Sequence, residues 1–122
     1  MLRVVRIAGT SMSPTLEDGD FVLVLRRVAL GRLHLFGAPR PGDVVLVDHR
    51  SLGAIVKRVE RRARDGRVTL RGDHPLSTSS AHLGAVPLGA VVGRAWLRIS
   101  PRARPARIAR GRPSRRRDEL VA

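Results

Sequence analysis

The chain has 122 residues, enough for one domain with a hydrophobic core and too few for two ordinary domains. Apolar residues make up 43% and aromatic residues only 2%, so Val, Leu, Ile and Ala must build the core. The absence of cysteine excludes disulfides, thiolate metal sites and a catalytic thiol. The net charge of +14 allows a nucleic acid or an anionic membrane as partner, although an arginine excess is also typical of GC-rich genomes.

No segment has the pattern of a signal peptide or of a membrane span. Near the start, short apolar runs are interrupted by Arg3 and Arg6, with no apolar stretch to follow. Nowhere does the chain approach the ~18 uninterrupted apolar residues of a spanning helix. We therefore expect a cytoplasmic protein without an integral membrane segment.

Five segments predict β-strands, because each is rich in Val, Leu or Ile and is bounded by Gly, Pro or Asp. In chain order they are residues 21–25, 44–47, 54–59, 67–71 and 90–99. The fourth alternates apolar and polar residues, as a half-exposed strand does, and Gly93 is expected to bend the last one. Short strands at this spacing predict a mainly β domain.

The strands fall within residues 1–100, which we predict to be a single domain. Within it, residues 26–40 mix apolar side chains with Arg, His and Gly and are expected to form a flap or an insertion. Residues 101–122 are rich in Arg and Pro and poor in core-forming residues, which predicts a disordered basic tail. Contact of this tail with nucleic acid or an anionic membrane stays open as an alternative.

Lys57 is the only lysine in a chain that otherwise uses arginine for positive charge. Arginine stays protonated near physiological pH, whereas burial lowers the pKa of a lysine and allows a neutral amine to act as a base. In a strand of period two, Lys57 shares one face with Ile55 and Val59, which are both apolar. The alternative is a surface lysine whose stem covers apolar neighbours while its ammonium stays in water.

Ser11 is the candidate nucleophile that such an amine would activate. It lies in the sequence GTSMSPTL, where Gly9 permits close approach of the backbone and Pro14 stiffens the following turn. A serine hydroxyl becomes nucleophilic when an adjacent base takes its proton, and Ser–Lys pairs are one such arrangement. The backbone N–H of Ser11 is a candidate oxyanion donor. A plain turn serine is the alternative, since spacing alone does not bring Ser11 and Lys57 together.

The remaining candidates for chemistry are weak. The four histidines lack metal-ligand spacing, so we expect structural or exposed roles for them and no bound metal; they are His34, His49, His74 and His82. No glycine-rich phosphate loop is present, and one Trp with two Phe cannot form a base-stacking platform. We expect no cofactor.

Three stretches, in this order, resemble the conserved boxes of bacterial type I signal peptidases and their soluble relatives. GTSMSPTLEDGDFVLV (residues 9–24) is similar to the nucleophile box and RPGDVVLVDHRSLGAIVKRV (40–59) to the lysine box. GDHPLSTSSAHLGAVPLGAVVGRA (72–95) is similar to the last box. The resemblance implies a mainly β fold of the signal-peptidase/LexA type and a serine endopeptidase that uses neither metal nor cofactor.

The resemblance also implies roles for single residues. Ser11 would be the nucleophile and Lys57 the general base. Support of the oxyanion and of the lysine is implied for Gly9, Thr10, Asp73 and Ser77, and contact with substrate for Met12 and Pro14. In this scheme Ser77 orients the lysine amine and Asp73 holds the last box in place.

The last box departs from the family pattern Ser-x-Asp-Ser-Arg. Ser79 replaces the Asp and Ala81 the Arg, so the usual support around the lysine is in doubt. The serine box also begins too near the first residue for the membrane helices of ordinary signal peptidases. In that respect the chain is similar to the soluble nickel-type superoxide dismutase maturation proteases of actinobacteria, which remove a short N-terminal extension from the dismutase precursor.

The nickel superoxide dismutase precursor is therefore the expected substrate. One alternative is a signal-peptidase-like protease that acts on another client at the membrane. A second is a repressor-type domain related to self-cleaving regulators, and a third is a non-catalytic basic module that binds nucleic acid.

Overall fold

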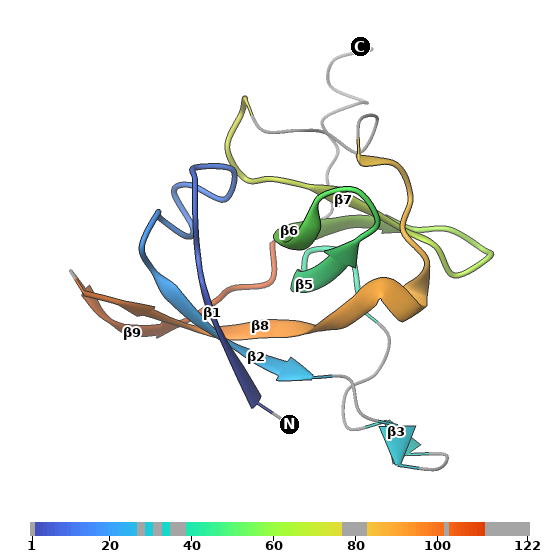
Figure 1. Cartoon of the computed structure of the whole chain (residues 1–122), viewed down its shortest axis with the longest axis horizontal. Helices are drawn as coiled ribbons and strands as arrows, with labels where there is room; N and C mark the ends of the chain where they lie inside the picture. Colours follow the sequence, from blue (N-terminus) through green and yellow to red (C-terminus); the bar gives the residue numbers. More distant parts are fainter. Residues whose placement is uncertain are drawn as a thin grey trace.

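An antiparallel sheet of seven strands forms the body of the domain in the computed structural model (Figure 1). The structure describes residues 2–26, 29–30, 33–34, 39–76, 83–101 and 103–111. The strands of this sheet are β1 (Leu2–Arg6), β2 (Phe21–Arg26), β5 (Val44–His49), β6 (Gly53–Arg62), β7 (Val68–Arg71), β8 (Val91–Ser100) and β9 (Ala103–Arg107). Their order is β1-β2-β8-β5-β6-β7, and β9 pairs with β8.

The predicted mainly β fold is confirmed. The five predicted strands correspond to β2, β5, β6, β7 and β8, and each predicted range overlaps its strand. The sequence-based prediction missed β1 and β9, which are short, largely exposed and rich in arginine. Pro105 fits within β9 because a strand at the edge of a sheet tolerates the missing N–H.

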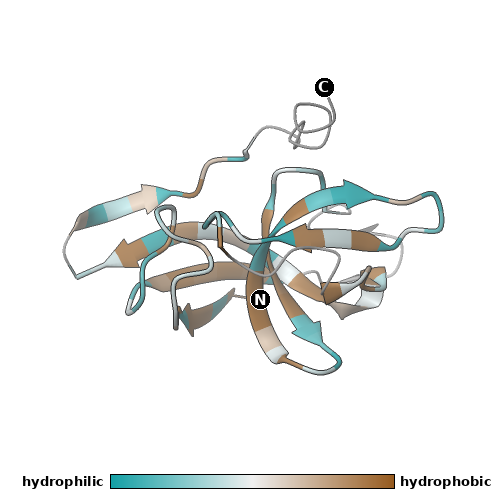
Figure 2. Cartoon of the chain, turned by 90° about the horizontal axis from the view of Figure 1, so that it is seen from above, coloured by the Kyte–Doolittle hydropathy of each residue, from teal (hydrophilic) through white to brown (hydrophobic). Residues whose placement is uncertain are grey.

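The core consists of two clusters on the two faces of β5. Val44 and Leu46 pack into the first cluster, with the apolar residues of β2 and of the loop that precedes it. Val45 and Val47 pack into the second, with the apolar residues of β7 and of the segment before β8. An unbroken apolar run is typical of a strand covered on both sides. Figure 2 shows the hydrophobic residues concentrated on the strands.

Gly93 lies where β8 passes closest to β2. A Cβ atom at this position would clash with the backbone of Leu25 and Arg26. The register of β8 against β5 shifts beside this glycine. A residue without a side chain is therefore required for the two strands to pair there.

The predicted domain boundary at residue 100 lies too early. β9 extends the sheet beyond it, and Ile108 is 8% exposed within the first core cluster. The N–H of Gly111 then donates a hydrogen bond of 3.0 Å to the carbonyl of Gly42. The ordered domain thus includes residues 103–111. Arginine side chains do not prevent this, because on an edge strand they extend into solvent and leave the backbone free to pair. The other residues of the predicted tail, 102 and 112–122, lie outside the described residues.

The predicted flap, residues 26–40, is described only in part. Its backbone forms a separate two-stranded ladder of β3 (Ala29–Leu30) and β4 (Leu33–His34) that projects from the main sheet (Figure 1). Positions 27–28, 31–32 and 35–38 lie outside the described residues. The assignment as a flap stays a prediction.

Candidate active site

Ser11 and Lys57 line the same cavity, which has a volume of about 210 Å³. The cavity lies between the end of β1, the loop that follows it, and the β5–β6 hairpin. The lining is mainly apolar and includes Ile7, Met12, Leu52, Ile55, Val56 and Leu83. Two residues far apart in the sequence, predicted to act together, thus line one cavity that is partly open to solvent.

The loop that carries Ser11 is fixed at both ends. The N–H of Ile7 donates to the carbonyl of Asp20 (2.7 Å), and the N–H of Gly19 donates back to Ile7 (2.8 Å). Leu16 is fully buried and anchors the middle of the loop in the core. The carbonyl of Ser11 accepts a hydrogen bond of 2.9 Å from the N–H of His74. Ser11 is therefore held on a rigid, partly exposed turn.

Lys57 is buried, with 7% of its surface exposed. It lies on β6 opposite Val45 of β5. Burial lowers the pKa of its amine below the ordinary value of 10.5. Within the described part of the chain, the amine has no hydrogen-bond acceptor and no carboxylate partner. The side chain can therefore lose its proton more readily than a surface lysine and accept one from a nearby hydroxyl.

The candidate oxyanion residues differ in their available donors. The N–H of Gly9 is occupied, because it donates to Oδ1 of Asp18 at 2.8 Å. Gly9 has a φ of 85°, which favours glycine, so its contribution is to the turn itself. Among the described residues, the N–H groups of Thr10 and Ser11 have no partner. These two groups are free to bind a developing negative charge.

The structure separates the two predicted substrate-contact residues. Met12 lines the cavity and is 2% exposed, since most of its side chain packs in the first core cluster. Pro14 is exposed and does not line the cavity. Its predicted contact with substrate stays a prediction. Ser77 lies outside the described residues, as do Ser79 and Ala81, so their roles stay predictions.

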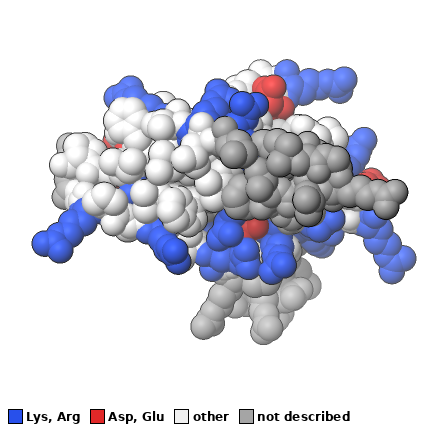
Figure 3. Space-filling model, turned by 90° about the horizontal axis from the view of Figure 1, so that it is seen from below, with Lys and Arg blue, Asp and Glu red and all other residues white. Residues whose placement is uncertain are grey.

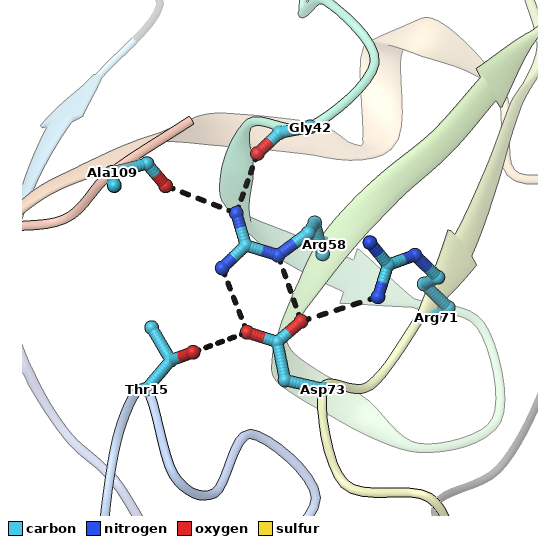
Figure 4. A network of polar contacts seen from close by, with 6 residues as sticks. All are labelled: Thr15, Gly42, Arg58, Arg71, Asp73 and Ala109. Carbon is cyan, nitrogen blue, oxygen red and sulfur yellow. Dashed lines mark hydrogen bonds and ion pairs between the residues drawn. The ribbon is translucent and has the colours of Figure 1, made fainter. Parts of the chain in front are cut away.

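Next to Lys57, Arg58 lies at the centre of a buried polar network (Figure 4). Its Nε and Nη2 donate to the two carboxylate oxygens of Asp73, each at 2.7 Å. Nη1 donates to the carbonyls of Gly42 (2.6 Å) and Ala109 (3.1 Å). Arg58 is 5% exposed, and such a bidentate pair with further acceptors satisfies a buried guanidinium.

Asp73 receives two further contacts. Thr15 donates its hydroxyl at 2.5 Å, and Arg71 lies 3.4 Å away. Burial alone would raise the pKa of the Asp73 carboxyl, but the hydrogen bonds from Arg58 and Thr15 and the charges of Arg58 and Arg71 lower it below its ordinary value. Asp73 thus joins Arg58 of β6 to Thr15 of the loop that carries Ser11. Such contacts are compatible with the structural role predicted for Asp73, which was to hold the last box in place.

Sequence reasoning missed Arg58. A strict alternation along β6 places it on the face away from Lys57, and the pattern gives no sign of which face is buried. The available signal was a charged pair, Arg58 and Asp73, within segments that are otherwise apolar or turn-like. Buried charges are retained when they are paired, so the two were candidates for each other.

Among the described residues, two acidic and two basic side chains are buried, so their burial leaves the net charge of the surface unchanged. Asp20 and Asp43 are each 4% exposed, because their carboxylates accept hydrogen bonds from backbone N–H groups of their own turns. Asp43 also accepts from Arg110 at 2.6 Å. Figure 3 shows a face on which basic side chains clearly outnumber acidic ones.

The chain was compared with models of known protein families. The model described as Peptidase S24-like matches residues 1–79, a range that contains the serine loop, Lys57, Arg58 and Asp73. Comparisons with curated proteins and with solved structures give no match. In the described part of the chain, no helix has both the length and the apolar character that a membrane span requires.

Proposed function

Since the chain belongs to the Peptidase S24-like family, and is therefore a serine peptidase, we propose that Ser11 and Lys57 form its catalytic dyad. The dyad is of the signal-peptidase type, and the protein is an endopeptidase that removes a short N-terminal extension from a precursor. One observation carries the proposal: a lysine that is 7% exposed, with a lowered pKa, lines the same cavity as the serine.

The proposed reaction begins with proton transfer from the Ser11 hydroxyl to the neutral amine of Lys57 as the oxygen attacks the scissile carbonyl. The N–H groups of Thr10 and Ser11 are the candidate donors to the resulting oxyanion. Lys57 then gives its proton to the leaving amine, which leaves an acyl group on Ser11. Water, deprotonated by the same amine, hydrolyses the acyl-enzyme and restores both residues.

For the substrate we propose the nickel-type superoxide dismutase precursor, on the resemblance of the three sequence boxes. A mainly apolar cavity of about 210 Å³ has room for a small side chain beside the scissile bond. Cleavage of this precursor takes place in the cytoplasm in this proposal, and it requires neither metal nor cofactor.

Co-expression with the dismutase precursor tests the dyad and the substrate together. The mass of the intact dismutase is measured with wild-type protease, Ser11→Ala, Lys57→Ala and a control, Ser13→Ala. Ser13 lies in the same loop, but its hydroxyl donates to Glu17 at 2.8 Å and it does not line the cavity. We expect trimming by wild type and Ser13→Ala only. Trimming by Lys57→Ala would contradict the dyad, and no trimming by wild type would contradict the substrate.

Self-cleavage is a second candidate function. The family match favours it, because the S24/LexA-like peptidases that it indicates are the group to which the self-cleaving regulators named above belong. In that case the protease would cut its own chain rather than a partner. The same mass spectra measure the protease itself, so the two functions are separated in one experiment. Loss of mass from wild type, but not from Ser11→Ala, with the dismutase unchanged, would favour self-cleavage.

A further inference from the structure

One wall of the active-site cavity is formed by the turn between β5 and β6 together with the segment before β8. Leu52 contributes from the turn and is 57% exposed. Leu83 contributes from the other segment and is 6% exposed, since it also belongs to the second core cluster. The wall therefore joins one weakly packed residue to one firmly packed residue.

A second cavity lies behind this wall. It has a volume of about 600 Å³, and Leu83 lines both cavities and so separates them. His49 and Ser51 line this second space. Because Leu83 is packed in the core and Leu52 is not, hydrogen bonds rather than packing are needed to fix the Leu52 part of the wall.

The side chain of His49 supplies those hydrogen bonds. Its Nδ1 accepts from the N–H of Ser51 (3.1 Å) and of Leu52 (3.2 Å). Its Nε2 lies 3.0 Å from the carbonyl oxygen of Leu83. One imidazole ring therefore connects the turn with the segment before β8.

The three contacts are satisfied together by a single form of the ring. Backbone N–H groups only donate, so Nδ1 of His49 must carry a lone pair. A carbonyl only accepts, so Nε2 must carry the proton. The neutral ring with the proton on Nε2 meets both conditions, whereas an imidazolium would direct an N–H at two other N–H groups.

We propose that His49 is a positioning residue for the Ser11–Lys57 site, and that it sets the width of the cavity by tying Leu52 to Leu83. The inference rests on the proposed function, because it concerns substrate binding at that site. His49 itself does not line the active-site cavity and touches no reacting atom. Its loss should therefore act on KM far more than on kcat.

Two substitutions of His49 separate its two connections. His49→Asn keeps an acceptor for N–H groups two and three residues ahead, as asparagine does in turns, but is too short to reach Leu83. His49→Ala removes both connections. The control is Asp65→Ala, which removes a similar bond, from the N–H of Arg67 to Oδ1 of Asp65 (3.0 Å), in the neighbouring β6–β7 turn.

Cleavage of the dismutase precursor is measured for all four proteins at a temperature where each is folded by circular dichroism. We expect KM to rise about fivefold in His49→Asn, the usual effect of one lost hydrogen bond, and further in His49→Ala. We expect kcat to change by less than about twofold, and Asp65→Ala to match wild type. An unchanged KM in His49→Ala, or an equal effect of Asp65→Ala, would overturn the proposal.

A readout without substrate keeps the inference testable if wild type does not cleave the precursor. Nitrogen-15 NMR identifies the protonated ring nitrogen of His49, and hydrogen exchange measures the Leu52 N–H. We expect the proton on Nε2, and faster exchange of Leu52 in His49→Ala than in Asp65→Ala. A proton on Nδ1, or equal exchange in both variants, would overturn the proposal that His49 ties Leu52 to Leu83. If the expected NMR and exchange results are found but wild type does not cleave the precursor, only the proposed substrate is overturned.

Discussion

Lys57 and Arg58 are neighbours on β6, both basic and both buried, yet their surroundings differ completely. Arg58 has acceptors for its guanidinium in Asp73, Gly42 and Ala109. Lys57 has none within the described residues, and it faces a mainly apolar cavity with Ser11. The comparison teaches that a buried basic side chain needs either hydrogen-bond acceptors, as Arg58 has, or an amine that can release its proton, as Lys57 has.

The two environments suit opposite purposes. A guanidinium does not lose its proton in proteins, so it is suited to a permanent ion pair that joins segments. An amine loses its proton when it is desolvated without a counter-charge, so it is suited to act as a base. Because consecutive side chains of a strand point to opposite faces, β6 directs Lys57 to the cavity and Arg58 to the network around Asp73.

Exchange of the base for a permanent cation is expected to have the largest effect. Lys57→Arg keeps the charge but cannot supply a neutral amine, so the cleavage rate should fall by roughly 10²- to 10⁴-fold or more. The rate is measured with the precursor, and folding is checked by circular dichroism. A folded Lys57→Arg variant with wild-type activity would exclude Lys57 as the base.

Removal of the permanent cation should instead act on stability. Arg58→Met leaves the Asp73 carboxylate buried without its main partner, a loss that costs about 3–5 kcal/mol in comparable buried pairs. The free energy of unfolding is measured in urea. The double variant Arg58→Met, Asp73→Leu serves as the comparison and should recover part of this loss. Equal stability of Arg58→Met and wild type would show that the network does not hold the fold together.

The pH dependence should distinguish the two residues more finely. The pKa of Lys57 is lowered in the folded state, so between its folded value and 10.5 the unfolded chain binds more protons. Stability should therefore fall as the pH drops through this window, by at most about 1.4 kcal/mol per pH unit for one proton. Lys57→Met should abolish this slope, while the cleavage rate of wild type should rise with pH. A stability curve identical in Lys57→Met would contradict a lowered pKa.

Asp73 should give a second slope in acid. Its pKa is lowered below 3.8 on folding, so the stability it contributes is present above that value and is lost as the pH falls through its folded pKa. Lys57→Met should leave this acid limb unchanged, since the two groups titrate in different ranges. A change in both limbs would mean that the two sites are coupled.

The smallest effect is expected for a surface pair of the same charges. Arg67 and Asp65 lie 3.8 Å apart with 60% and 64% of their side chains exposed. Such pairs contribute about 0–1 kcal/mol, so Arg67→Ala should change the urea midpoint little. A loss as large as that of Arg58→Met would break the contrast between buried and exposed pairs.

The sequence was sufficient for the strands whose side chains make the core. The run VVLV predicted β5, and the apolar residues of AIVKRV after the turn at Gly53 predicted β6, because both patterns are dictated by burial. The exposed strands β1 and β9 carry no such signal, since pairing with a neighbour, rather than burial, makes them strands. Tertiary pairing of this kind is invisible in a local pattern.

The sequence was sufficient to nominate Ser11 and Lys57, but not to predict the hydrogen bonds of Arg58 and His49 around them. A single lysine among arginines predicted a base, and that role stays a prediction; the structure places Lys57 and Ser11 on the lining of one cavity. The links made by Arg58 and His49 depend on which distant carbonyls and N–H groups lie nearby. No spacing in the sequence shows those distances.

The strand order has a consequence for the newly made chain. β2, which follows the serine loop, is joined to β5 and β6 in the sheet only through β8, although β8 is translated after all of them. Until β8 leaves the ribosome, the halves of the sheet that carry Ser11 and Lys57 have no common strand. The nascent peptidase is thus expected to remain inactive during most of its own synthesis, and to acquire activity only after β8 has emerged.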